Sequence, residues 1–137
     1  MKIKGDKAHL ARLKRISGIA MVQEVGKALF VAGTMIEIDA ELSITAGSIS
    51  GKGHIPSKPG SPPSRDSGHL DNNIETRQVA PLKVEVSSNA AYSAALEFGT
   101  SKAEARPFMR PAAQRKRKEA EKLVAQAVRR VTRQKGP

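Results

Sequence analysis

The chain of 137 residues has no cysteine and no tryptophan, and only 3% of its residues are aromatic. The absence of cysteine excludes disulfides and thiolate metal ligands, and it leaves the redox compartment open. With so few aromatic rings, a core must be built from aliphatic side chains. The length predicts one domain, 1–137, that buries about two-thirds of its unfolded surface.

The chain also lacks an uninterrupted apolar run. Its first twenty residues are basic and have no apolar signal-peptide core, and the apolar-rich stretch 19–38 is interrupted by Gln23, Glu24, Lys27 and Glu37. This pattern argues against a signal peptide and against a membrane span. We therefore expect no membrane partner and synthesis in the cytoplasm of the host cell.

Positive charge is abundant but unevenly distributed. The net charge is +11, composed of +5 for residues 1–17, −3 for residues 18–101 and +9 for residues 102–137. A mildly acidic body with two basic ends indicates a polyanionic partner or an acidic surface on a neighbouring subunit.

Residues 7–44 carry apolar side chains at three- and four-residue spacing, which predicts helix. Gly18, Gly26 and Gly33 each weaken that pattern by about 1 kcal/mol relative to alanine. We expect a kink or break near Gly33, giving one long bent helix or two shorter ones, with Asp6 as the N-cap.

Residues 45–70 form the least core-like segment, because fifteen of the 26 are Gly, Pro or Ser. Such a composition predicts a loop or extended arm. Two interpretations stay open, a solvated linker and an arm that orders against a neighbouring subunit.

Two strands and two further helices are predicted after the arm. Leu82–Val86 alternates apolar and charged residues as a half-buried strand does, and it pairs in a hairpin with a weaker strand, 70–79, through Ala80-Pro81. A short helix is predicted over 90–98, ending at Gly99, and a basic terminal helix over 112–133 with an apolar stripe that includes Ala113, Ala127 and Val131. The expected fold is therefore α+β, a small antiparallel sheet packed by a long N-terminal helix and a C-terminal helix, with a long Pro/Gly/Ser-rich loop or arm.

No pattern of catalytic or metal-binding residues is found in the sequence. His9, His54 and His69 lie far apart, and the serines lack a nucleophile-elbow spacing. Glu37, Asp39 and Glu41 alternate near a helix end and are most simply a solvated face. We expect no enzyme activity, no metal and no cofactor.

The basic C-terminal helix is the candidate for contacts to phosphates or to an acidic partner. The residues concerned are Arg115, Lys116, Arg117, Lys118, Arg129 and Arg130. The helix has no interleaved aromatic residues for base stacking. Both interpretations stay open, with a solvated basic face that meets an acidic partner surface favoured over DNA.

The few aromatic residues gather between Tyr92 and Pro111, which contain the only tyrosine and two of the three phenylalanines. Phe98 and Phe108 could plug the core where the hairpin meets the terminal helix. Arg106 and Arg110 each precede a proline that holds the backbone extended, and arginines positioned in this way suit ion pairs across an interface. We expect a mixture of the two roles.

This region resembles the tail-completion (tail-component) family of long-tailed bacteriophages. The resemblance rests on two motifs, Tyr92-x-x-x-Leu-Glu-Phe-Gly-Thr100 and Ala105-Arg-Pro-Phe-Met-Arg-Pro-Ala112, and the order of the other segments is also similar. The corresponding assembly residues are Tyr92, Leu96, Glu97, Phe98, Gly99, Thr100, Arg106, Pro107, Phe108, Arg110 and Pro111.

The resemblance implies a non-enzymatic structural protein of the virion neck or tail, with an α+β fold. It implies a homo-oligomeric ring, of six subunits by family analogy, that contacts head-closure, tail-terminator or tail-tube proteins near the DNA channel. A head-closure stopper and a tail terminator remain alternatives within that system, and a basic nucleic-acid-binding accessory protein is the alternative from another class.

Overall fold

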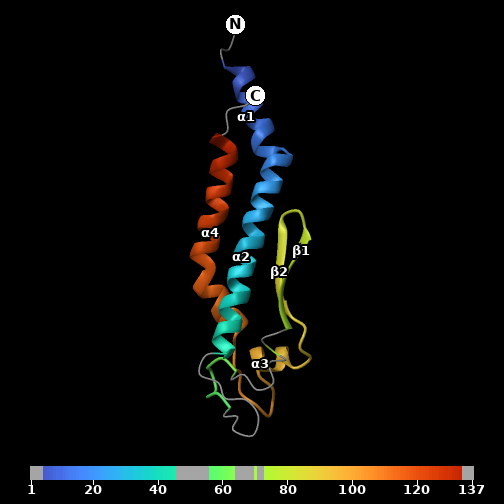
Figure 1. Cartoon of the computed structure of the whole chain (residues 1–137), viewed down its shortest axis with the longest axis vertical. Helices are drawn as coiled ribbons and strands as arrows, with labels where there is room; N and C mark the ends of the chain where they lie inside the picture. Colours follow the sequence, from blue (N-terminus) through green and yellow to red (C-terminus); the bar gives the residue numbers. More distant parts are fainter. Residues whose placement is uncertain (1–4, 46–55, 64–69, 71–72, 134–137) are drawn as a thin grey trace.

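The computed structural model describes residues 5–45, 56–63, 70 and 73–133. The elements follow the order α1 (Asp6–Ser17), α2 (Ile19–Thr45), β1 (Ile74–Ala80), β2 (Lys83–Ser88), α3 (Ser93–Phe98) and α4 (Met109–Arg133). α2 is a central spine with α4 along one side and the β1–β2 hairpin along the other (Figure 1). This arrangement confirms the predicted α+β class, with a small antiparallel sheet and long N- and C-terminal helices.

The N-terminal helical region divides at a different glycine from the one expected. The break lies at Gly18, and α2 continues through Gly33 without interruption. Gly33 faces the hairpin, where an added Cβ would lie 2.7 Å from Thr76 Cγ2 and 2.9 Å from Val84 Cγ1. The prediction of a break there was wrong because this glycine permits close packing of the sheet on the helix.

The start of α1 differs from the prediction by one residue. Asp6 is the first helical residue and not the N-cap, although its Oδ1 accepts a hydrogen bond from the Lys7 backbone N–H at 2.8 Å. The carbonyl of Gly5 accepts the first helical hydrogen bond, from the His9 N–H at 2.9 Å.

The predicted hairpin is confirmed, with shifted ends. Ile74 pairs with Ser88 and Thr76 with Val86, and the turn is formed by Pro81 and Leu82. Leu70, predicted as the strand start, is instead a buried turn residue, and Leu82, predicted as an inward strand residue, is exposed in the turn.

The two later helices also have shifted boundaries. α3 begins at Ser93 and not at Ala90, which is buried in the core. α4 begins at Met109, three residues before the predicted start, because proline is tolerated in the first turn of a helix, where Pro111 lies. In the apolar stripe, Ala112 is buried whereas Ala113 is exposed.

The core lies at the end of the molecule where α2, α3, the hairpin and the start of α4 meet. Phe108 and Ile44 are its largest fully buried side chains, and Ile74, Leu70 and Ala112 pack with them. Farther along the molecule, α2 and α4 share contacts through small residues such as Ala28, Ala32 and Ala127.

One helical stretch in the described part of the chain, Ile19–Ile44, is long and apolar enough to cross a membrane. The core helix of a soluble protein can have the same length and composition. This observation therefore does not by itself indicate a membrane span.

Candidate assembly site

Glu97, in the last turn of α3, caps the start of α4. Its Oε2 accepts hydrogen bonds from the backbone N–H groups of Phe108 (2.8 Å) and Met109 (3.0 Å), and its Oε1 accepts one from that of Arg110 (2.8 Å). The first N–H groups of a helix have no partner within the helix, and a carboxylate is also favoured by the helix dipole. Glu97 therefore fixes the orientation of α4 relative to α3. The sequence did not predict this role.

Gly99 and Thr100 shape the turn that leaves α3. Gly99 has a φ of 76°, in the left-handed region, and a Cβ at this position would lie 2.9 Å from the backbone nitrogen of Ala105. Thr100 Oγ1 accepts hydrogen bonds from the N–H groups of Lys102 (3.2 Å) and Ala103 (3.1 Å). The Gly-Thr pair thus specifies a tight turn, in which Gly99 has a backbone conformation that only glycine adopts readily.

Arg106 holds part of the predicted arm against the junction. Its Nε donates a hydrogen bond to the Ser57 carbonyl at 3.1 Å, and its backbone N–H donates one to the Leu96 carbonyl at 2.6 Å. The Gly60 N–H donates to the Ala105 carbonyl at 2.8 Å. Residues 56–63 are therefore tied to their own chain, while residues 46–55 and 64–69 of the arm lie outside the described residues.

The two phenylalanines of the motif have opposite environments. Phe108 is 1% exposed and packs in the core, as predicted, whereas Phe98 is 71% exposed at the end of α3. The prediction that Phe98 could plug the core was wrong, because the short helix α3 ends at Phe98 and buries none of its residues. An exposed ring held on a fixed turn remains a candidate for contact with another molecule.

A shallow groove of about 390 Å³ lies beside Phe98. Its lining residues are Glu97, Phe98, Ala105, Pro107, Arg110, Pro111 and Gln114. The structure therefore brings five of the eleven predicted assembly residues to one surface: Glu97, Phe98, Pro107, Arg110 and Pro111. Tyr92 is exposed at the N-cap of α3, and Leu96 is partly buried against the core, so neither lines this groove.

Arg110 lines the groove and is exposed, whereas Arg106 is half-buried and bonded to Ser57. The two arginines, predicted together as interface residues, thus differ in role. Arg106 organises its own chain, and Arg110 remains accessible to a partner.

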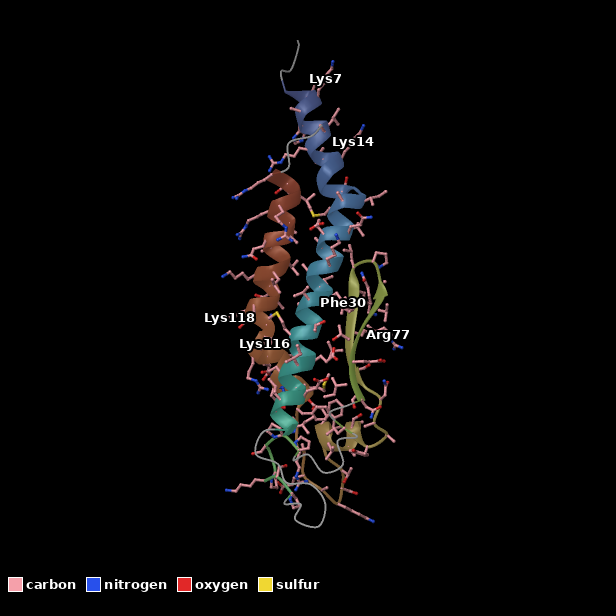
Figure 2. All side chains as sticks on the ribbon, viewed as in Figure 1. Lys7, Lys14, Phe30, Arg77, Lys116 and Lys118 are labelled. Atoms are coloured by element: carbon pink, nitrogen blue, oxygen red, sulfur yellow. The ribbon has the colours of Figure 1, made fainter. Side chains whose placement is uncertain are left out.

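The basic side chains of α4 lie along its length, and Lys116 and Lys118 are on the opposite side of α2 from Arg77 of the hairpin (Figure 2). Four of the six candidate residues are near carboxylates of the same chain: Arg115 Nε lies 2.7 Å from Asp39, Arg117 Nε 3.0 Å from Glu121, Arg130 Nη2 3.6 Å from Glu24 and Lys116 Nζ 3.9 Å from Glu119. Among the described residues, Lys118 and Arg129 have no such carboxylate partner.

The acidic residues near the end of α2 hold elements together. Asp39 pairs with Arg115 of α4, and Glu37 Oε2 accepts a hydrogen bond from Thr76 Oγ1 of the hairpin at 2.5 Å. The interpretation of Glu37 and Asp39 as a solvated face was wrong, because each connects α2 to a different neighbour.

Across residues 5–45, 56–63, 70 and 73–133, no group of three or more His, Cys, Asp or Glu side chains could hold a metal ion. His9 is exposed on α1, and His54 and His69 lie outside the described residues. The arrangement that the structure offers is a rigid junction with an exposed ring and a groove.

Comparisons with protein-family models, curated proteins and solved structures gave no match to this chain.

Proposed function

We propose that this chain is a structural protein of the neck or tail of a long-tailed bacteriophage, which completes the tail or joins head and tail as a homo-oligomeric ring. The observation that carries the proposal is the position of Phe98. Its exposed ring stands beside the groove, and the turn that presents it is fixed by Glu97 and Gly99. A pre-organised aromatic side chain next to a groove suits subunit docking, because little conformational entropy is lost on binding.

The ring would contain six subunits by analogy with the family that the sequence resembles, and its neighbours would be head-closure, tail-terminator or tail-tube proteins. In the virion it would surround or adjoin the DNA channel. A head-closure stopper and the tail terminator itself are alternatives that would use the same junction.

Electron microscopy of particles produced without this protein tests the proposal. Separate filled heads and tails are expected if the protein joins them, and abnormally long tails would indicate the terminator. Supplying Phe98→Ala should fail to restore complete particles, while Val79→Ala, at an exposed position on the hairpin, should restore them. Normal infectious particles in the absence of the protein would refute the proposal.

A nucleic-acid-binding accessory role is the second candidate, favoured by the basic outer side of α4. The ion pair of Arg115 with Asp39 weakens that case, because it is short and its carboxylate is only 21% exposed, so this arginine is already engaged within the chain.

A further inference from the structure

The face of α2 between α4 and the hairpin carries apolar side chains between a lysine and a glutamate, and no other described element covers it. Lys27, Phe30, Thr34, Ile38 and Glu41 follow one another at three- or four-residue steps, which places them on one side of a helix. Phe30 is 42% exposed and Ile38 is 50% exposed, and Val31 and Leu42 flank them as exposed apolar residues. Phe30 lies midway along α2 (Figure 2).

The other two sides of α2 are already occupied. Gly26 and Gly33 face the hairpin, and Glu24 and Asp39 pair with Arg130 and Arg115 of α4. The remaining face is therefore a third side of α2, and none of the described residues covers it.

The sequence of this face is complementary to itself. If two α2 helices cross antiparallel at Thr34, Thr34 lies opposite its own copy, Phe30 lies opposite Ile38, and Lys27 lies opposite Glu41. The Phe30–Ile38 and Lys27–Glu41 pairs each occur twice and the Thr34 pair lies on the axis, as a two-fold contact requires. Both charged residues already have an interaction within their own chain, that of Lys27 being with Glu24 at 3.4 Å, so a pair between two copies would form by exchange of partners. The side chain of Lys27 is 74% exposed, and a surface ion pair of this kind contributes little, so the exchange costs little.

We infer that the exposed face of α2 binds the same face of a second copy of this chain, antiparallel and centred on Thr34. The basic outer side of α4 cannot serve this purpose, because two copies of it would repel each other. The contact closes on itself and gives a pair. The proposed ring needs a different, head-to-tail surface, for which the Phe98 groove is available, so the two ideas are independent.

Single-cysteine crosslinking tests the register directly, because the chain has no cysteine of its own. With a short thiol–thiol crosslinker, Thr34→Cys should give a covalent dimer. Lys27→Cys should not, because its copy would lie about 21 Å away along the helix axis. A mixture of Lys27→Cys and Glu41→Cys should crosslink again. Equal crosslinking of Thr34→Cys and Lys27→Cys, or none of either, would overturn the inference.

Charge reversal provides a second test in the uncrosslinked protein. Lys27→Glu should weaken the dimer at least tenfold in sedimentation equilibrium, and Lys27→Glu with Glu41→Lys should restore it. Ile38→Asp should give monomers, while Val79→Asp, at an exposed hairpin position, should leave the dimer intact.

A wild-type protein that is monomeric at high micromolar concentration overturns the inference. So does a protein that floats with lipid vesicles while Thr34→Cys gives no crosslink, because the exposed face would then bind lipid and not a second copy. The particle-joining experiment is separate. If wild-type protein completes particles but no dimer forms, only the α2 contact is wrong. If the dimer forms but particles assemble without the protein, only the proposed function is wrong.

Discussion

Arg115 of α4 and Asp39 of α2 form an ion pair, with Nε 2.7 Å from Oδ2. From the sequence, Arg115 was interpreted as a contact for phosphates or for an acidic partner, and Asp39 as part of a solvated face. Because the two residues engage each other, Arg115 contributes less to the cationic surface of α4 than its place in the basic run 115–118 suggests.

We therefore expect only weak, sequence-independent binding of duplex DNA. Any shift of labelled DNA at low micromolar protein should disappear between about 50 and 200 mM salt, since phosphate contacts release counterions. Lys118→Ala should reduce it more than Arg115→Ala does, because Arg115 is paired with Asp39. Binding that survives 200 mM salt would favour the nucleic-acid role.

Glu97→Ala should lower the free energy of unfolding by about 1–3 kcal/mol, because three backbone N–H groups lose their acceptor. Urea denaturation measures this loss. Glu104→Ala, an exposed carboxylate in the same connection, serves as the control and should change stability by less than about 0.5 kcal/mol. Equal stability of the Glu97→Ala variant and the wild type would refute the capping role.

Phe108→Ala and Phe98→Ala should separate stability from assembly. Loss of the buried Phe108 ring should cost about 3–5 kcal/mol. Phe98→Ala should change stability by less than about 0.5 kcal/mol and should nevertheless impair particle completion. Thermal melts with a complementation assay measure both. A strongly destabilised Phe98→Ala variant would place that ring in a core and not at an interface.

Gly33→Ala should destabilise the protein by about 1–3 kcal/mol, although alanine is the better helix former by about 1 kcal/mol. The new Cβ would approach Thr76 Cγ2 and Val84 Cγ1 and force the hairpin away from α2. Adding Thr76→Ser, which removes Cγ2 and keeps the hydroxyl that binds Glu37, should recover part of the loss. A stabilised Gly33→Ala variant would show that the hairpin moves freely.

The sequence predicted the elements well where the chain follows a simple period. The alternation in Leu82–Val86 and the 3.6-residue stripe of the terminal helix both identify real elements. The sequence did not predict the roles of Gly18 and Gly33 correctly. A glycine that ends a helix and a glycine that lets a strand pack closely on a helix cannot be distinguished until the position of the strand is known.

The candidate site was only partly predictable. Phe98 and Phe108 are of one residue type, and only their places, at the end of α3 and just before α4, decide which is buried. The cap by Glu97 connects residues 11 to 13 positions apart across an irregular turn, and no short motif describes such a bond. Pairs such as Asp39 with Arg115, 76 residues apart, depend on the whole fold.

These sequence separations have a kinetic consequence. The Glu97 cap closes a short loop, so its entropic cost is small and it can form early in folding, whereas the Asp39–Arg115 pair must wait for α2 and α4 to meet. In stopped-flow measurements, we expect Glu97→Ala mainly to slow folding and Asp39→Ala mainly to speed unfolding. The junction would then be the nucleus from which the long helix pair closes.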